Sequence, residues 1–382
     1  MAANPILDFA LGQQKAWLEQ ALAQQKAVYD ETLKMWSRLL AVPRAVEWAR
    51  DVKVGTTPHD VVYEEDTLRL LHYRSEAPAK YAEPVLICYA LVNRPYIVDL
   101  QSDRSVIRQF LARGLDVYLI DWGVPSAADR GMRLADYIDG LMKNCADAVV
   151  RQAGTPNLHL VGYCMGGTMS AIFTTRYPEL VKTLTLMTAP LDFSVGGDKS
   201  LVQFWSNPEY FDIDALVDAF GNIPAEFLQY SFQMMKPVQN YYQKYVTFYE
   251  KLDDEKFVEN YFAMEKWTND NIPVAGETFR EFVKKLYQRN ELVRGEFRLV
   301  AGEPPIDLKR ITCPLMLLTA SADHLVPPEQ STNVIPYVGS TDIKNETLEA
   351  GHIGLAVSTK AHKKFWPAAT QWLADRSSPK AL

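Results

Sequence analysis

The sequence predicts an α/β protein with a mostly parallel sheet and a helical insertion, and three features carry this prediction. Short apolar runs alternate with helix-like segments through the first half of the chain, which is typical of βαβ units. A Gly-x-Cys-x-Gly turn at residues 162–166 joins one apolar run to one such helix. The alternation stops after Asp192 and resumes at Cys313, so we expect an inserted segment between them.

Residues 4–50 are predicted to form one helix with an apolar stripe. The apolar positions follow alternating steps of three and four, and Gln25 fills one position of the seam. The stripe consists of Leu18, Leu22, Tyr29, Leu33, Trp36 and Leu40. Two interpretations remain open: the stripe packs on the helix's own domain, or it docks a partner chain.

Strands and helices are expected to alternate after the breaks at Pro43, Gly55 and Pro58. We expect a hairpin at 59–63 and 68–73, and further strands at 84–91, 116–120, 158–162, 184–187, 315–319 and 345–348. Helices are expected at 103–113, 134–152 and 165–177, and a last helix is expected to begin near Pro367. Gly114 and Gly154 end the first two of these helices.

The inserted residues 195–295 are rich in aromatic side chains and are interrupted by Pro224, Pro237 and Pro273. We interpret them as a helical cap subdomain over the catalytic edge of the sheet. The alternative is an extra helical domain with no part in substrate access. The expected organisation is an amphipathic N-terminal segment at 1–57, a core at 58–194 and 296–382, and the cap at 195–295.

Composition argues against several classes of protein. The net charge of −7 argues against a nucleic-acid binder. The four cysteines include no CxxC pair, so we expect neither a metal site nor a disulfide framework, and reduced thiols in the cytoplasm. The N-terminus lacks a basic stretch followed by an apolar one, and no apolar run reaches about 18 residues, so we expect no signal peptide and no transmembrane segment. No cofactor is expected.

Cys164 is the candidate nucleophile. It stands between an apolar strand and a helix, in the order of the nucleophile elbow of the α/β-hydrolase fold, with Cys in place of Ser. Side chains at Gly162 and Gly166 would collide with the neighbouring strand and helix, which explains both glycines. The N-terminal end of the following helix favours the thiolate. The alternative is a buried cysteine in a Gly-rich corner.

Asp323 and His352 are the candidate acid and base. Asp323 follows the strand at 315–319, and His352 follows the strand at 345–348 on a Gly-flanked loop. In this fold the triad runs nucleophile, acid, base along the chain, each member after a strand, so the three residues agree in order and place.

Other polar residues compete for these roles. His324 is an alternative histidine, but as the neighbour of Asp323 it is expected to have a hydrogen-bonding or structural role. Asp121 and Asp192 also follow strands and are alternative acids. His159 lies inside the strand before Cys164 and is interpreted as a packed core histidine.

Two backbone N–H groups are needed to stabilise an oxyanion. We expect one from Met165, after the nucleophile, and the other from Val92 in the loop after the strand at 84–91, with Asn93 as the near alternative. A Cys nucleophile also indicates the reaction. Exchange of one thioester for another is nearly thermoneutral, so Cys164 can be loaded reversibly from a thioester and remain activated toward an alcohol.

Eight blocks of the chain resemble the polyhydroxyalkanoate (PHA) synthases, the polyester-making enzymes of bacterial storage granules. The resemblance covers roughly residues 58–375, including the expected cap, and residues 1–57 match least. The blocks are 89–96, 119–123, the 162–167 box, 221–224, 264–267, 275–280, 323–328 and 351–354.

The resemblance implies an (R)-3-hydroxyacyl-CoA substrate, with 3-hydroxybutyryl-CoA expected, and polyester and free CoA as products. It assigns Cys164 as nucleophile, Asp323 as acid and His352 as base, and it gives Cys145 a structural role. The short chain is similar to the PhaC catalytic subunit of the two-subunit types, which work with a PhaE or PhaR partner. The tracts around Trp267 and Asp323 look most like the PhaE-dependent class III.

The resemblance further implies a homodimer or hetero-oligomer on the surface of cytoplasmic storage granules. Two alternatives remain open. One is an acyl-CoA thioesterase or esterase of the same fold, and the other is a non-catalytic granule-associated protein.

Overall fold

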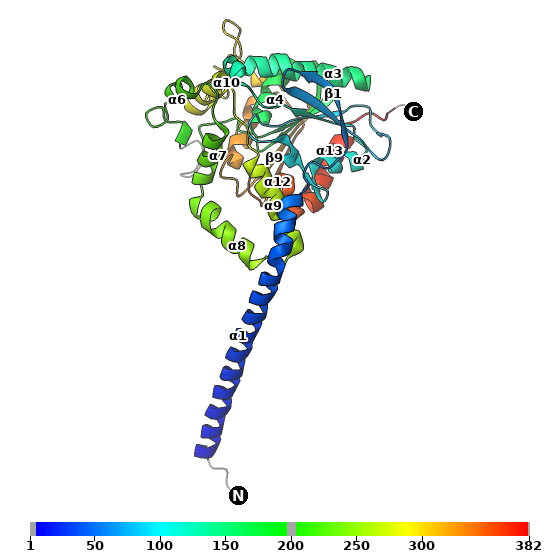
Figure 1. The fold of residues 1–382 in the computed structure, drawn as a ribbon. Helices are drawn as coiled ribbons and strands as arrows, with labels where there is room; N and C mark the ends of the chain where they lie inside the picture. The colour runs from blue at the N-terminus through cyan, green and yellow to red at the C-terminus, as the bar shows by residue number, and fades with distance from the viewer. Residues whose placement is uncertain (1–4, 197–203, 381–382) are drawn as a thin grey trace. The chain divides into compact units, whose positions relative to one another are not determined.

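The computed structural model describes residues 5–196 and 204–380 (Figure 1). The chain forms two compact units, one of Met1–Val52 with Val238–Ala263 and one of Lys53–Pro237 with Met264–Leu382. Part of the segment that the sequence assigns to a cap therefore groups with the N-terminal helix. The predicted boundaries of core and cap at 195 and 295 stay a prediction.

The larger unit is built on an eight-stranded sheet of order β1-β2-β6-β3-β7-β8-β9-β10 (Figure 1). Only the pairs β1–β2 and β2–β6 are antiparallel, so the sheet is mostly parallel, as predicted. The strands are β1 His59–Glu65, β2 Leu68–Tyr73, β3 Val85–Cys88, β6 Val117–Asp121, β7 Leu158–Tyr163, β8 Val181–Met187, β9 Leu315–Ala320 and β10 Ile343–Leu348.

The central strands are apolar runs because helices cover both faces of a parallel sheet. All residues of β3, β6, β7 and β9 are buried, whereas the edge strand β10 is mostly half-exposed. The covering helices include α2 Val106–Arg113, η3 Asp136–Met142, α3 Lys143–Ala153, α4 Met165–Arg176 and α13 Trp366–Ala374. α2 packs against α13, and η3 packs against α4.

The helix expected from residue 103 begins later, at Val106. Arg104–Ser105 forms β5, which pairs with β4 Asp99–Gln101. Ser105 then caps α2 by accepting a hydrogen bond from the Arg108 N–H. The helix ends as predicted at Gly114, whose φ of 91° suits glycine.

Helices follow β8 in the larger unit: α6 Ile213–Phe220, α7 Ala225–Met234, α10 Gly276–Glu281 and η6 Phe282–Gln288. Among the described residues of 195–295, the only β-type pairing is the isolated bridge between Ile223 and Val274. The predicted change from βα alternation to helices is therefore confirmed for the described part of this segment.

The smaller unit contains α1 Pro5–Asp51, η5 Gln239–Gln243, α8 Lys244–Glu250 and the first part of α9 Glu255–Asn269. Its small core is formed by Ala45, Leu252 and Val258, with Phe248 and Phe262 packed against it. The single predicted helix is confirmed, but the break expected at Pro43 is wrong, because Pro43 lies inside this helix.

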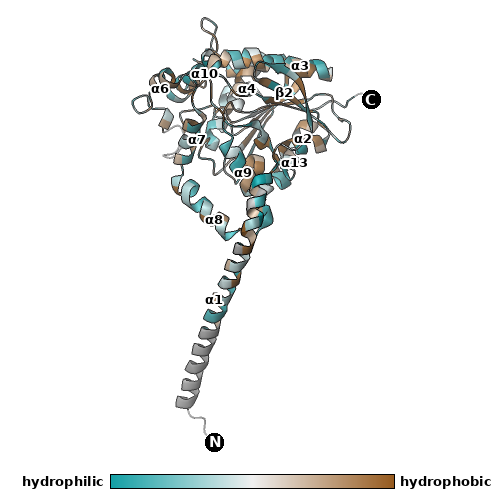
Figure 2. Ribbon diagram, viewed as in Figure 1, coloured by the Kyte–Doolittle hydropathy of each residue, from teal (hydrophilic) through white to brown (hydrophobic). Residues whose placement is uncertain are grey.

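The predicted stripe of α1 is largely exposed where its side chains are described. Tyr29, Leu33, Trp36 and Leu40 are 63%, 49%, 56% and 78% exposed, and Figure 2 shows apolar residues along this part of α1. The side chains of Leu18 and Leu22 lie outside those that the structure describes. Both interpretations of the stripe stay predictions. Among the described helices, α1 included, none is both long and apolar enough to span a membrane.

Candidate active site

Cys164 occupies a sharp turn between β7 and α4. Its φ and ψ of 55° and −127° are unusual for a residue with a side chain, and such strain concentrates at functional sites. A Cβ on Gly166 would lie 2.3 Å from the Cys88 carbonyl oxygen, and one on Gly162 would lie 2.6 Å from the Gly167 Cα. Backbone meets backbone at both positions, so only glycine fits.

The parallel pairing of β9 with β10 brings the loops of Asp323 and His352 together. The pairing ends at Leu348 beside Ala320, and the Ala322 N–H then donates to the Ala350 carbonyl at 3.0 Å. Parallel strands end at the same edge of a sheet, so residues just beyond each strand become neighbours.

His352 is held between Asp323 and Cys164. The His352 Nδ1 lies 2.7 Å from the Asp323 Oδ2, and the Asp323 Oδ1 accepts the N–H groups of Leu325 and Val326, both at 2.9 Å. Asp323 and His352 are 6% and 5% exposed, and the Cys164 thiol is within hydrogen-bonding reach of His352. The structure thus brings the three sequence-predicted residues together.

Opposing effects act on the charge of His352. Burial lowers the pKa of His352, but the negative charges of Asp323 and Cys164 raise it by more than burial lowers it. The resulting pKa is about 10. The proton on the imidazole is therefore stabilised by the charges of its two neighbours.

Tyr163, just before the nucleophile, supports the histidine loop. Its hydroxyl donates to the His352 carbonyl at 3.1 Å, and the two rings lie 5.6 Å apart. It is 1% exposed. Sequence reasoning missed this contact, and adjacency to Cys164 was the only signal that could have suggested it.

The two backbone N–H groups expected to stabilise the oxyanion both stay predictions, and the structure bears on the alternative to one of them. Met165 is the first residue of α4, where N–H groups have no intrahelical partner. The Asn93 N–H donates to the Asn271 side-chain oxygen at 3.0 Å, so it is already engaged. Val92 stays the prediction for the second donor.

The loop of Val92 is clamped by residues from far along the chain. The Trp267 indole N–H donates to the Arg94 carbonyl at 2.8 Å, and Asp270 contacts both Arg94 and Tyr96. Trp267 and Asp270 therefore hold the loop that contains Val92 in place. No local sequence pattern indicates these contacts.

The alternative acids have other partners. Asp121 pairs with Arg69 at 2.7 Å. Asp192 accepts hydrogen bonds from the side chains of Ser194, Asn290 and Asn333 at 2.7–2.9 Å, which tie the end of β8 to two other segments. The sequence did not indicate this second role for Asp192.

The remaining histidines and cysteines fit structural roles to different degrees. His159 is fully buried, and its ring nitrogens lie 2.8 Å from the hydroxyls of Thr183 and Ser377, as expected of a core histidine. His324 is different, because its Nδ1 is buried without a hydrogen-bond partner in the described part of the chain. Burial also lowers the pKa of His324 to about 4. Cys145 is fully buried in α3.

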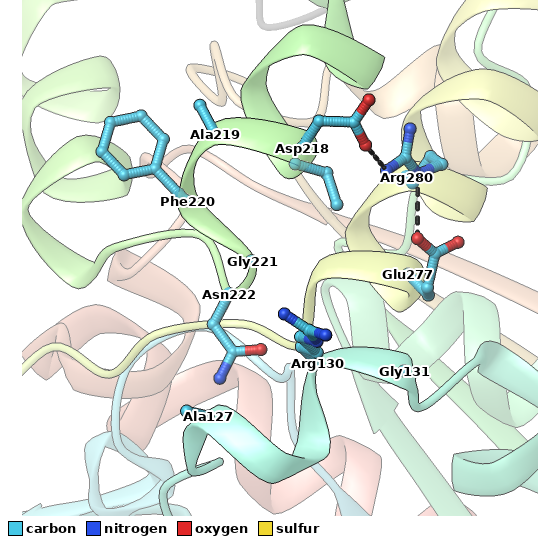
Figure 3. A pocket seen from close by; sticks show the side chains of 11 residues that line it. Ala127, Arg130, Gly131, Asp218, Ala219, Phe220, Gly221, Asn222, Glu277 and Arg280 are labelled. Carbon is cyan, nitrogen blue, oxygen red and sulfur yellow. Dashed lines mark hydrogen bonds and ion pairs between the residues drawn. The ribbon is translucent and has the colours of Figure 1, made fainter.

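A cavity of about 680 Å³ lies between α6, α10 and the turn at Ala127–Gly131 (Figure 3). Its charged lining residues are Arg130, Arg280, Asp218 and Glu277, so the wall carries two positive and two negative charges. The lining includes none of Cys164, Asp323 and His352. We therefore do not place the acyl group in this cavity.

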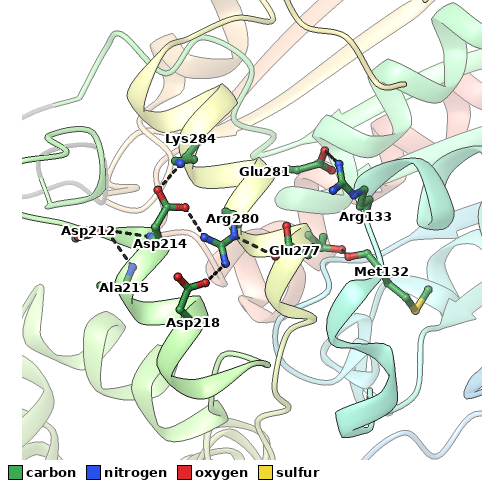
Figure 4. Close-up of polar contacts among 11 residues, drawn as sticks. Met132, Arg133, Asp212, Asp214, Ala215, Asp218, Glu277, Arg280, Glu281 and Lys284 are labelled. Atoms are coloured by element: carbon green, nitrogen blue, oxygen red, sulfur yellow. Dashed lines mark hydrogen bonds and ion pairs between the residues drawn. The ribbon is translucent and has the colours of Figure 1, made fainter. Parts of the chain in front are cut away.

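The same region is cross-linked by ion pairs around Arg280 (Figure 4). Arg280 binds Asp218 at 2.6 Å and Glu277 at 3.1 Å, and it also binds Asp214, which Lys284 contacts from the other side. The hydrogen bonds from Lys284 and Arg280 lower the pKa of Asp214. This network joins α6 to α10 and η6.

No group of three or more His, Cys, Asp or Glu side chains in the described chain could hold a metal ion. A thiol, an imidazole and a carboxylate are groups that can perform nucleophilic catalysis.

Comparison with known proteins adds a family to this geometry. Residues 83–355 match the family model of the alpha/beta hydrolase fold, and residues 44–110 match that of the poly-beta-hydroxybutyrate polymerase (PhaC) N-terminus. The poly(3-hydroxyalkanoate) polymerase subunit PhaC of Haloferax mediterranei is 43% identical over 357 residues, covering 94% of this chain and 72% of that protein.

Other similar proteins agree. The PhaC subunit of Allochromatium vinosum is 43% identical, over 86% of this chain and 91% of its own, and that of Synechocystis is 41% identical, over 85% and 86%. A lipase-like structure from Sulfolobus solfataricus is 14% identical with a TM-score of 0.50, over 84% of this chain and 99% of that one. The expected α/β-hydrolase fold is confirmed.

Proposed function

This chain belongs to the family of poly(3-hydroxyalkanoate) polymerase PhaC subunits, and from that premise we propose a reaction for it. It polymerises (R)-3-hydroxyacyl-CoA, with 3-hydroxybutyryl-CoA expected, through an acyl thioester on Cys164. The observation that carries this proposal is the placement of His352 between the Asp323 carboxylate, at 2.7 Å, and the Cys164 thiol.

The first half-reaction loads the enzyme. The Cys164 thiolate attacks the acyl-CoA carbonyl, and the N–H groups of Met165 and Val92 stabilise the oxyanion. The C–S bond to CoA breaks, the His352 imidazolium gives its proton to the departing CoA thiolate, and the acyl group stays on Cys164.

The second half-reaction extends the chain. Neutral His352 takes the proton of the 3-hydroxyl of another hydroxyacyl unit, and that oxygen attacks the thioester on Cys164. The Cys164 thiolate leaves, an ester bond forms, and the thiolate–imidazolium pair is restored. Asp323 orients His352 and stabilises its charge, or it acts on the hydroxyl more directly.

The helices between β8 and β9 act as a cap in this proposal. Water competes with the alcohol for the thioester, and a water-excluding aromatic lining also strengthens the oxyanion contacts. Opening of this cap admits CoA and releases polymer.

Replacement of Cys164 tests the nucleophile. Cys164→Ala should release no CoA from 3-hydroxybutyryl-CoA, measured as free thiol, while keeping the circular dichroism spectrum of the unmodified chain. Cys145→Ala is the matched control, because Cys145 is buried in α3, and it should keep turnover. Turnover by Cys164→Ala would overturn the assignment.

Replacement of Asp323 separates two roles for the acid. If Asp323 acts on the hydroxyl, Asp323→Asn should keep the single release of CoA that accompanies loading but stall chain growth. An equal loss of both steps would indicate orientation of His352 alone. Acylation of Cys164 is followed by mass spectrometry and chain growth by polymer yield.

Product analysis distinguishes the polymerase from a thioesterase and from a non-catalytic granule protein. A thioesterase would yield free 3-hydroxy acid, and a non-catalytic granule protein would release no CoA. High-mass polyester with equimolar CoA supports the polymerase.

A PhaE-type partner, with PhaR as the alternative, docks on the exposed stripe of α1 in this proposal, and the assembled enzyme works as a homodimer or hetero-oligomer on the surface of cytoplasmic storage granules. The support is the exposure of Tyr29, Leu33, Trp36 and Leu40. Leu33→Glu with Leu40→Glu should abolish co-purification of the partner. Gln24→Glu with Ala27→Glu adds the same charge on the opposite helix face and should leave it intact.

A further inference from the structure

Tyr287 is a buried phenol in η6 that none of the steps above uses. It packs in an aromatic cluster, with ring centroids 4.8 Å from Phe193, 5.2 Å from Trp205 and 5.9 Å from Phe282. Trp205 continues the cluster toward Phe279 at 5.2 Å. Of these five rings only Tyr287 has a hydroxyl, so that group stands out in an otherwise apolar wall.

The segment that bears Tyr287 is fixed to the edge of the sheet where the strands lead into Cys164 and Asp323. Asn290, at the end of this segment, accepts the Phe193 N–H at 2.8 Å and donates to the Asp192 carboxylate at 2.9 Å. Asp192 and Phe193 follow β8, which lies between β7 and β9 in the sheet. The strands that lead to Cys164 and to Asp323 are thus its two neighbours.

The Tyr287 phenol is buried, and the charges of the reacting groups act on it. Tyr287 is 5% exposed, and its hydroxyl makes no hydrogen bond to the described residues 5–196 and 204–380. Burial, followed by the negative charges of Cys164 and Asp323, raises the pKa of Tyr287 well above its usual value. The phenol therefore stays protonated and is available as a hydrogen-bond donor.

Two other phenols lie near the thiol but differ from Tyr287. The Tyr163 hydroxyl is committed to the His352 carbonyl. The Tyr89 ring packs edge-on against the Tyr163 ring at 5.3 Å, and burial, followed by the charge of Cys164, raises the pKa of Tyr89. Among the described residues, Tyr287 is thus the one of these three phenols that has an uncommitted hydroxyl and on which the charges of both Cys164 and Asp323 act.

We propose that the Tyr287 hydroxyl binds the 3-oxygen of the hydroxyacyl group and so selects 3-hydroxyacyl over plain acyl substrates. This proposal rests on the polymerase function above. The carbonyl oxygen of the acyl group is bound by backbone N–H groups, so the 3-oxygen is the polar atom that still needs a partner. A donor to that oxygen leaves the 3-hydroxyl proton free for His352 and stabilises the developing alkoxide.

Loading of Cys164 by two substrates tests the proposal. Tyr287→Phe removes only the hydroxyl, and single-turnover CoA release is measured with (R)-3-hydroxybutyryl-CoA and with butyryl-CoA. We expect the rate with the hydroxyacyl substrate to fall by about tenfold, as for one lost hydrogen bond, while the rate with butyryl-CoA is unchanged. Chain growth, which needs the alkoxide, should fall at least as much.

Tyr137→Phe is the matched control. Tyr137 is also 5% exposed and packs edge-on against Trp122 at 5.5 Å, and neither rate should change. An equal fall of both rates in Tyr287→Phe would indicate a structural role and overturn the proposal, as would no change in either. If the unmodified chain loads from neither substrate, the polymerase function itself fails, and the role of Tyr287 fails with it.

Discussion

At the scale of single residues, the site depends on how closely backbone segments approach around Cys164. Gly166 lets α4 lie directly against the end of β3 and the residue that follows it, where a Cβ would come within 2.6 Å of three backbone atoms of Cys88 and Tyr89. The glycine is therefore required by packing.

Gly166→Ala should cost at least about 2 kcal/mol of unfolding free energy, because backbone atoms rather than a flexible side chain must move. CoA release should fall with it. Gly140→Ala is the control, because a Cβ there meets nothing within 4 Å, and it should be neutral or slightly stabilising. Urea unfolding of both variants checks this, and equal stability of the two would contradict it.

The pKa of His352 predicts how CoA release depends on pH. CoA release should decline as the pH rises through about 10, where His352 loses the proton that the departing thiolate needs. Asp323→Asn removes one of the two anions that raise the pKa of His352, so this alkaline limb should move to lower pH. Asp121→Asn, whose carboxylate pairs with Arg69, should leave the limb in place. Single-turnover rates of CoA release between pH 6 and 11 test this prediction. If the alkaline decline of Asp323→Asn occurs at the same pH as in the unmodified chain, the role of the Asp323 charge is refuted.

At the scale of elements, β7 is fastened to the end of the chain. The two ring nitrogens of His159 lie 2.8 Å from the hydroxyl of Thr183 in β8 and 2.8 Å from the hydroxyl of Ser377, just after α13. Burial lowers the pKa of His159 from 6.5 to about 4. The histidine is therefore neutral in the folded protein, whereas in the unfolded chain it takes up a proton below pH 6.5.

The contribution of neutral His159 to the free energy of unfolding is present above pH 6.5 and is lost as the pH falls toward 4. The shift corresponds to roughly 3 kcal/mol in this window. His159→Gln should be less stable at pH 7 but should lose less stability than the unmodified chain between pH 6.5 and 4. The exposed His59→Gln should keep the original slope. Urea titrations at several pH values measure this, and parallel slopes for His159→Gln and the unmodified chain would rule it out.

At the scale of the whole molecule, ion pairs hold together the helices between β8 and β9 in the larger unit. Arg280 is 19% exposed at its side chain and binds carboxylates of two helices. Its removal leaves Asp218 and Glu277 without this cation. Arg280→Met should cost about 1–2 kcal/mol, less than a fully buried pair because Asp218 is largely exposed. Arg294→Met, which breaks one exposed pair with Glu296, should cost almost nothing. Thermal unfolding compares the two, and equal transition temperatures would contradict the prediction.

Much of the architecture could be read from local pattern. The hairpin, the buried strands, the elbow and the helices ending at Gly114 and Gly154 each depend on a periodicity or a turn residue within a few positions. The start of α2 was misjudged because Arg104–Ser105 pairs with Asp99–Gln101. Such pairing between short segments has no signature in hydrophobic periodicity.

The sequence by itself determined the kind of site: a Cys elbow followed in order by an Asp and a His, each after a strand. Those features depend on residue type and on chain order, which a sequence records directly. Tertiary structure decided which polar groups are committed and which are free. Asn93 is engaged by Asn271, and Asp192 is engaged by Asn290 and Asn333. Partners so far apart along the chain meet only when the sheet and the helices after β8 are assembled, so no local pattern could indicate them.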